Sequence, residues 1–238
     1  MHEYYAQNKK KLKKTMNDYL KHIAPELENQ TGKPYVETLE EIWEYYDKNL
    51  LEHFPYIGGD DVSGTSNLTG AYYFVAMGEI LKKYGMELHE AGHLMVICYE
   101  RYFDAESKLV TAIARKALRN PKLAELVYTK KDRKNAANAA KYPGSFETKT
   151  QIPPEKGYDF SYHNLVCPLA LFARKFGYER YMPYLCNLDY VMLGHYNLPL
   201  YREHTCFEDG DYCDFKIKLD APVMKAWPPV YMQGKGYK

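Results

Sequence analysis

Apolar residues recur at steps of three and four through the first part of the chain. This spacing predicts amphipathic helices over residues 4–23 and 36–54, and the Gly-Lys-Pro sequence at 32–34 separates them. Gly, Asp and Ser gather at 55–67, which predicts a loop. The next segment, 68–85, is strongly apolar and predicts a buried helix.

Two more helical regions follow. Gly85 is expected to end the buried helix, because glycine readily takes the left-handed conformation that follows many helices. Residues 86–103 then predict another helix, since apolar side chains again fall on one face. That apolar stripe consists of Leu88, Ala91, Met95, Cys98 and Tyr102. The section 105–140 is charged and is predicted to be rich in helix.

The second half of the chain has a different pattern. Pro, Gly and Thr at 141–157 predict a turn and an extended link. Alternating apolar and polar residues from Tyr158 onward predict a strand. A short helix is expected to open at Pro168, and a second helix follows with Pro183 in its first turn.

Residues 198–220 predict two strands joined by a tight turn at 208–211, where Gly210 supplies the positive φ that such turns need. The Pro-rich tail is predicted to extend over the surface. Together these elements predict an α+β fold, with a helical N-terminal half followed by a small antiparallel sheet and two packed helices. The expected regions are a helical N-terminal region (1–64), an α+β domain (65–220) and an extended tail (221–238).

Composition narrows the classes of function. The net charge of +1 gives no sign of a nucleic-acid or membrane-surface partner, and no apolar run approaches the ~20 residues that span a bilayer. Five cysteines, an odd number, and the lack of a signal-peptide pattern predict reduced thiols in the cytoplasm. The 25 tyrosines suit a pocket for a polar small molecule. We therefore expect a small-molecule substrate as partner and no cofactor, and a homo-oligomer stays open.

The sequence HEAGH fits the pattern H-E-x-x-H. On a helix, His89 and His93 lie one turn apart with Glu90 beside them, as in zinc metalloproteases. The longer form of the motif fails, because Val96 and Tyr99 stand where a Gly and a third His would be. The apolar stripe accounts for this helix without a metal, so no metal site is predicted. A zincin-type metalloprotease is the least favoured alternative.

Nucleophile candidates lie further along the chain. Cys167 precedes Pro168 at a predicted helix start, where free N–H groups and the helix dipole favour a thiolate. Cys186 and Asp189 share a face of the next helix, and His195 follows within two turns. A thiol, a carboxylate and an imidazole can form a nucleophile with its base. The alternative is a set of structural residues: buried thiols, an Asp bound to a loop and an exposed His.

The two predicted strands add candidate binding residues. Arg202 is able to clamp a carboxylate with two parallel bonds. Cys213 and Phe215 are expected to point to one face of the sheet and Asp214 to the other. We treat Arg202, Cys213 and Asp214 as candidate substrate-binding residues. The structural alternatives are an ion pair between Arg202 and Asp214 and a place for Cys213 in the sheet core.

These segments resemble a known family. The sequence NLVCPLALFARKFGYERYMPYLCNLDYVM, followed by LYREHTCFEDGDYCDFKIK, is similar to the L-2-amino-thiazoline-4-carboxylic acid hydrolase family. The likeness covers roughly residues 65–218 and includes a Cys-Pro that opens a helix, a Cys-x-x-Asp helix, an Arg-bearing strand and a hairpin ending in Cys-Asp-Phe. Cys206 departs from the pattern, because an aliphatic residue is expected there.

The resemblance implies hydrolysis of a carbon–nitrogen bond in a small cyclic amidine, which opens the ring of 2-amino-thiazoline-4-carboxylate toward a carbamoyl-cysteine. A thiolate of Cys186 or Cys167 would attack the ring carbon, Asp189 or His195 would move protons, and Arg202 would anchor the substrate carboxylate. Attack by water without a covalent step would use the same residues. The alternative from another class is a non-catalytic small-molecule binding or sensor protein, because the strand ending also resembles 4-vinyl reductase-type domains.

Overall fold

The structure, a computed structural model, describes residues 1–208 and 210–233. The chain divides into two compact units, Met1–Tyr102 and Phe103–Lys238. The division falls inside one helix, so it does not coincide with a linker. The predicted boundaries after residues 64 and 220 therefore remain predictions.

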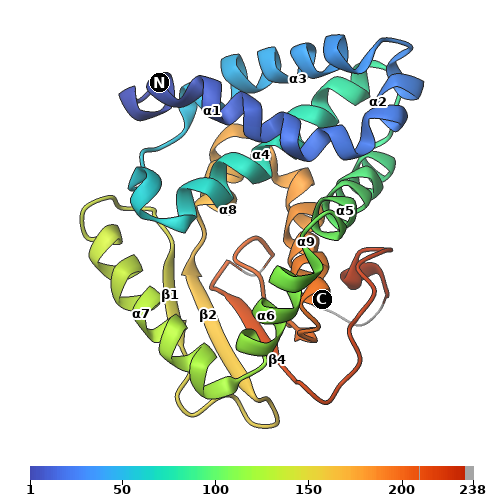
Figure 1. The fold of residues 1–238 in the computed structure, drawn as a ribbon. Coiled ribbons are helices and arrows are strands. Elements are labelled where there is room, and N and C mark those ends of the chain that lie inside the picture. The colour runs from blue at the N-terminus through green and yellow to red at the C-terminus, as the bar shows by residue number, and fades with distance from the viewer. Residues whose placement is uncertain (209, 234–238) are drawn as a thin grey trace. The chain divides into compact units, whose positions relative to one another are not determined.

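The first unit is built from helices (Figure 1). The separation at the Gly-Lys-Pro sequence is confirmed, because Gly32 ends the second helix with a φ of 68°. The predicted loop at 55–67 is wrong in its last part, since the buried helix already begins at Ser63. Ser and Thr side chains at this helix start bind nearby carbonyls, as Ser66 Oγ does to Ser63 O at 2.8 Å. The helices are α1 (Glu3–Leu20), α2 (Ala24–Thr31), α3 (Tyr35–Asn49), α4 (Ser63–Lys83) and α5 (Leu88–Asp104).

The second unit combines helices with an antiparallel sheet of strand order β1-β2-β4-β3, which confirms the α+β prediction. In Figure 1, α7 runs alongside β1 and β2. The strand β1 lies within the segment predicted as an extended link, so that part of the sheet was missed. The elements are α6 (Lys108–Leu118), α7 (Pro121–Ala139), β1 (Glu147–Thr150), β2 (Phe160–Val166), α8 (Pro168–Phe176), α9 (Met182–His195), β3 (Leu200–Tyr201) and β4 (Cys213–Ile217).

The predicted tight hairpin between the last two strands is wrong. Residues 202–212 separate β3 from β4, which pair over Leu200↔Ile217 and Tyr201↔Lys216. The backbone leaves the ladder after Tyr201 because the carboxylate of Asp214 binds the backbone N–H groups of the residues that follow Arg202. The predicted turn at 208–211 includes Asp209, which lies outside the described residues, and Gly210 has the expected positive φ of 88°.

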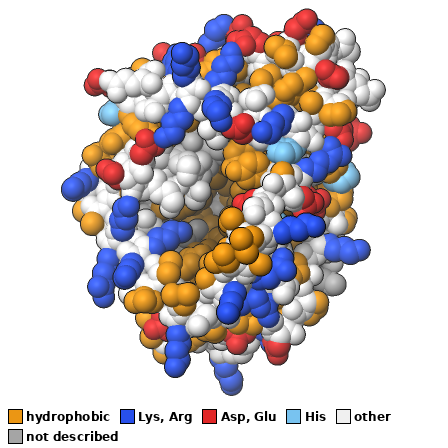
Figure 2. Space-filling view, viewed as in Figure 1, with side chains coloured by type: hydrophobic (Ala, Val, Ile, Leu, Met, Phe, Trp, Pro, Cys, Tyr) orange, Lys and Arg blue, Asp and Glu red, His pale blue; other side chains and the backbone are white. Residues whose placement is uncertain are grey.

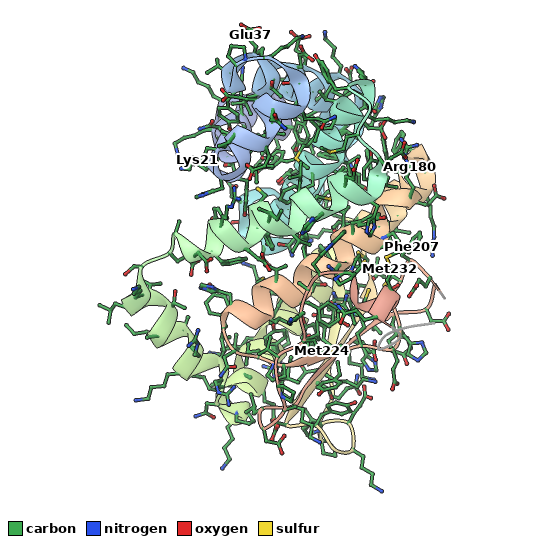
Figure 3. All side chains as sticks on the ribbon, turned by 90° about the vertical axis from the view of Figure 1, so that its right-hand side faces the viewer. Lys21, Glu37, Arg180, Phe207, Met224 and Met232 are labelled. Atoms are coloured by element: carbon green, nitrogen blue, oxygen red, sulfur yellow. The ribbon has the colours of Figure 1, made fainter. Side chains whose placement is uncertain are left out.

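The C-terminal segment is held more firmly than predicted. Figure 3 shows Met224 and Met232 on this segment. The buried amide of Asn187 in α9 anchors it, donating to Ala226 O at 2.5 Å and accepting from Val230 N at 3.1 Å. A cavity of about 600 Å³ is lined by this segment, by Tyr158 and by the chain around Arg202. The tail therefore helps to enclose space beside the loop that holds Arg202.

The helix pair α6 and α7 exposes apolar side chains. In the lower part of Figure 2, Lys and Arg side chains lie among hydrophobic ones on this pair. The exposed apolar residues of the two helices are Leu109, Val110, Ile113, Leu123, Leu126 and Val127. In the described part of the chain, no helix combines the length and apolarity required to cross a membrane.

A polar clamp fixes α7 to β1. Asp132 Oδ1 accepts from the hydroxyl of Thr148 at 2.6 Å, and Oδ2 accepts from the backbone N–H and the hydroxyl of Thr150 at 2.7 and 2.6 Å. Asn135, one turn later, donates to Thr148 Oγ1 at 3.0 Å. The polar face of this helix therefore binds the sheet edge directly, and the clamp sets the position of the side chains on the neighbouring face of α7.

Replacing Asp132 by Ala is expected to lower the free energy of unfolding by about 1–3 kcal/mol, because three partly buried donors lose their acceptor. Denaturant unfolding checks this value. The control is Lys134→Ala on the same helix, since Lys134 is exposed and its loss is expected to change stability by less than about 0.5 kcal/mol. Equal stability of the two variants would contradict the clamp.

Candidate active site

Arg202, directly after β3, lies at the centre of the candidate site. Its side chain is only 1% exposed, and each of its three nitrogens donates to the protein. Nη2 binds Asp189 Oδ2 at 2.7 Å, Nη1 binds Cys186 O at 3.2 Å and Nε binds Asp214 O at 3.2 Å. Arg202 therefore forms its ion pair with Asp189 and meets only the backbone carbonyl of Asp214, so the structural alternative of an Arg202–Asp214 ion pair is not formed.

Three aromatic rings connect Arg202 to α7. The guanidinium lies over the ring of Phe215 with its carbon 4.0 Å from the centroid. Phe215 stacks on Tyr162 at 4.5 Å and 11°, and Tyr162 meets Tyr128 of α7 at 4.5 Å. Burial raises the pKa of both tyrosines, so both rings stay neutral. We call Tyr128, Tyr162 and Phe215 the aromatic stack; at its far end, Lys131 Nζ lies 5.2 Å from the Tyr128 centroid.

Asp189 offers one open oxygen. Its Oδ2 binds Arg202, whereas Oδ1 has no hydrogen-bond partner among the residues that the structure describes, and the side chain is 33% exposed. The negative charge of Asp189 acts on the pKa of several surrounding groups, so those groups lie close to it. They include Tyr128, Lys131, Cys167, Cys186 and Cys213. Asp189 thus keeps one oxygen open on a carboxylate whose charge acts on the thiols and on Tyr128.

Four thiols gather in the same region. Cys167 at the start of α8 and Cys186 on α9 are partly exposed, whereas Cys206 and Cys213 are buried. Burial raises the pKa of Cys167 to about 12, and the backbone N–H groups at the helix start only partly offset this rise. The expectation that the helix start favours a thiolate at Cys167 is therefore wrong. Burial, followed by the nearby Cys213, also raises the pKa of Cys186 well above its usual value.

Cys213 differs from the other thiols. Its pKa is lowered, chiefly because the thiol of Cys206 hydrogen-bonds to it, with further help from the charge of Arg202 and from the Cys206 N–H, 3.2 Å from Cys213 Sγ. The Cys206 thiol also donates to the carbonyl of Asn164 at 3.3 Å, so this carbonyl and Cys213 share the single S–H proton of Cys206. An ionised Cys213 is the stronger acceptor of the two. Of the buried thiols Cys206 and Cys213, Cys213 is therefore the one whose environment favours ionisation.

The carboxylate of Asp214 is fully engaged by the protein. It accepts from the backbone N–H of Glu203 at 2.9 Å and of His204 at 2.7 Å, and it pairs with Lys216 Nζ at 2.8 Å. Its side chain is 2% exposed. These contacts indicate that Asp214 positions the backbone after Arg202, and its predicted contact with substrate stays a prediction.

A family model for L-2-amino-thiazoline-4-carboxylic acid hydrolase matches residues 79–217, which is more than half of the chain. The chain belongs to this family. The match confirms the resemblance noted from the sequence, and it contains every site residue described above. The family is named for a hydrolase, so membership supports an enzyme of the hydrolase type in general. No curated protein and no solved structure matches the chain.

Within this family assignment, Cys206 gains a physical role. It occupies the position where an aliphatic residue is expected, and here its N–H and thiol both face Cys213. An aliphatic residue would keep the backbone donor and lose the thiol donor. The thiol at this position donates to Asn164 O at 3.3 Å, a hydrogen bond that an aliphatic side chain could not form.

His195 lies apart from the other candidates. It ends α9, and its Nε2 is 3.3 Å from Thr111 Oγ1 and 3.5 Å from Glu106 Oε2. Its ring stacks on Phe103 at 5.1 Å. Thr111 lies in α6, and Phe103 and Glu106 lie just before it. No contact between these three residues and Asp189 is found among the described residues. The structure thus brings together Cys167, Cys186, Asp189, Arg202 and Cys213, and it gives His195 other neighbours.

Sequence reasoning missed Tyr128, Tyr162 and Lys131. The segment 105–140 was interpreted only as a charged helical section. A usable signal was present, because Tyr128, Asp132 and Asn135 recur at helical spacing and mark a polar face of α7 that meets the sheet. That Lys131 lies next to the aromatic stack could not be inferred without knowing which helix covers the sheet.

The HEAGH sequence lies in α5, within the family match. His89 is exposed and His93 is partly buried, and burial lowers the pKa of His93. Ala91 and Met95 are buried, which fits the predicted packing stripe. Among the described residues, no group of three or more His, Cys, Asp or Glu side chains is arranged to hold a metal ion.

Proposed function

We propose that the chain hydrolyses a carbon–nitrogen bond of a small cyclic amidine such as 2-amino-thiazoline-4-carboxylate. One water is consumed: the ring carbon that bears the amino group becomes the carbonyl of a carbamoyl group, and the ring nitrogen becomes a free amine. The observation that supports this most is that Cys167 and Cys186 are partly exposed and both feel the charge of Asp189, inside the family match.

The charges of the site suit such a substrate. A cyclic amidine is cationic when protonated, and the carboxylate on the ring is anionic. The carboxylate of Asp189, with one oxygen open, favours the cationic end. Because Arg202 is neutralised by Asp189 and held by two carbonyls, anchoring the substrate through Arg202 would require an exchange of these bonds.

Cys186 is the nucleophile that the geometry favours. It is partly exposed and lies one helical turn before Asp189 on the same face. Since its pKa is raised, the thiol needs a base as it attacks, and the open oxygen of Asp189 is the base that we assign to this step. The Cys186 sulfur forms a bond to the ring carbon, the bond to the ring nitrogen breaks, and that nitrogen receives a proton. Water then releases the carbamoyl product and restores the thiol.

The decisive measurement is the nature of the group released. Incubation with 2-amino-thiazoline-4-carboxylate is expected to give a product heavier by one water and bearing a new primary amine. Amine derivatisation and thiol titration of the small-molecule fraction distinguish the two ring-opening routes. A new small-molecule thiol would mean that the carbon–sulfur bond breaks, which overturns the proposal. Substrate incubated without protein is the control.

A non-catalytic binding protein is the second candidate, and one feature favours it. An apolar cavity of about 180 Å³ is lined by residues that include Tyr128, Tyr162, Phe160 and Leu193. Such a cavity suits a small apolar group. A binding protein would return each cyclic amidine chemically unchanged, so the same product measurement separates the two functions.

A further inference from the structure

Lys131 on α7 is a cation without an anionic partner in hydrogen-bond contact. Its side chain is partly buried, and it has no hydrogen bond or ion pair within the residues that the structure describes. Its Nζ instead lies 5.2 Å from the centroid of Tyr128. Burial lowers the pKa of its ammonium group, and the charges of Asp132 and Asp189 act in the opposite direction. A partly desolvated cation of this kind is stabilised when an anion reaches it.

The two carboxylates whose charges act on Lys131, Asp132 and Asp189, both bind other groups of the protein. Both oxygens of Asp132 accept from threonines of β1, so this carboxylate is directed at the sheet edge. Asp189 gives one oxygen to Arg202, and that pair satisfies the charge of the other buried cation of the site. Of the two cations at the ends of the aromatic stack, Arg202 is therefore neutralised and Lys131 is not.

We propose that Lys131, held over Tyr128, is the subsite that binds the carboxylate of an anionic substrate. This inference rests on the proposed function and names which part of the substrate is recognised and by what. The substrate's carboxylate pairs with Lys131 at one end, while its cationic amidine faces the open oxygen of Asp189. Two opposite charges on the ligand thus meet two opposite charges of the protein, which fixes the orientation of the ring relative to Cys186.

Binding of two ligands to three variants tests the subsite. The ligands are 2-amino-thiazoline-4-carboxylate and 2-aminothiazoline, which lacks the carboxylate. Lys131→Met is expected to weaken binding of the carboxylate by about 10–100-fold and to leave 2-aminothiazoline within about twofold, because only the charged hydrogen bond is lost. Lys131→Arg is expected to restore most of the affinity. Lys134→Met, at an exposed position on the same helix, is the control and is expected to bind as the unmodified chain does.

Calorimetric titration measures these affinities without turnover, and a thermal unfolding scan verifies that each variant folds. Equal weakening for both ligands would overturn the subsite, as would unchanged carboxylate binding in Lys131→Met. If the unmodified chain binds 2-amino-thiazoline-4-carboxylate no more tightly than 2-aminothiazoline, the assignment of the subsite is wrong as well. Carboxylate-selective binding without any hydrolysis would leave the subsite standing and refute the proposed hydrolysis, so the two failures are distinguishable.

Discussion

Replacing Arg202 by Met is expected to reduce the free energy of unfolding by about 3 kcal/mol. The guanidinium is 1% exposed and binds the Asp189 carboxylate and two backbone carbonyls, so its removal leaves three acceptors without their donors. Breaking a buried ion pair costs about 3–5 kcal/mol, and the lower end applies because Asp189 is 33% exposed and water can reach it.

The two tryptophans make this measurement specific to the second unit. Trp43 lies in the first unit and Trp227 in the second. In a Trp43→Phe background, denaturant unfolding followed by fluorescence therefore reports on the unit that contains Arg202. Arg133→Met is the control, because Arg133 is exposed on α7, and a change below about 0.5 kcal/mol is expected.

A second variant separates the ion pair from simple packing. Asp189→Asn removes the charge that Arg202 neutralises, so the double variant Arg202→Met with Asp189→Asn is expected to lose less stability than the sum of the single variants. Strict additivity of the two changes would contradict the pairing, and the contribution of Arg202 would then lie in its stacking on Phe215.

The pairing illustrates what sequence reasoning could and could not supply. The helix that presents Cys186 and Asp189 was predicted from its apolar pattern, and the strand with Cys213 from its alternation. The partner of Arg202 was not predicted: a substrate carboxylate and Asp214 were considered, and Asp189 was not. The partner is decided by the backbone: the Asp214 carboxylate binds the N–H groups that follow Arg202, which leaves Asp189 for the guanidinium.

The errors have a common physical origin in tertiary contacts. A tight hairpin was predicted from turn residues, yet Asp214 draws residues 203–204 out of the ladder. The thiol of Cys167 was expected to ionise at a helix start, yet burial outweighs the nearby N–H groups. Lys131 and the aromatic stack were missed because side-chain contacts join α7 to the sheet. One example is Asp132, which binds Thr148 and Thr150 of β1, and the sequence pattern of the strands does not reveal such contacts.

Replacing Cys186 by Ser is expected to lower kcat for 2-amino-thiazoline-4-carboxylate by about 10³-fold or more, with KM little changed. A serine hydroxyl is a far weaker nucleophile than a thiol, and the single-atom change leaves Arg202 in place because Arg202 binds the Cys186 carbonyl. Steady-state kinetics gives both parameters. Mass spectrometry of the quenched reaction is expected to find an adduct of the whole substrate on Cys186 in the unmodified chain, because ring opening releases no fragment.

Variants of two other cysteines supply a control and a test of the alternative nucleophile. Cys98→Ser, in the first unit, keeps a hydrogen-bonding group 3.2 Å from Tyr19 O and is expected to retain normal turnover. If Cys186→Ser is fully active while Cys167→Ser is not, the nucleophile is Cys167. If both are active and no adduct forms, water attacks the ring directly, and the open oxygen of Asp189 is its base.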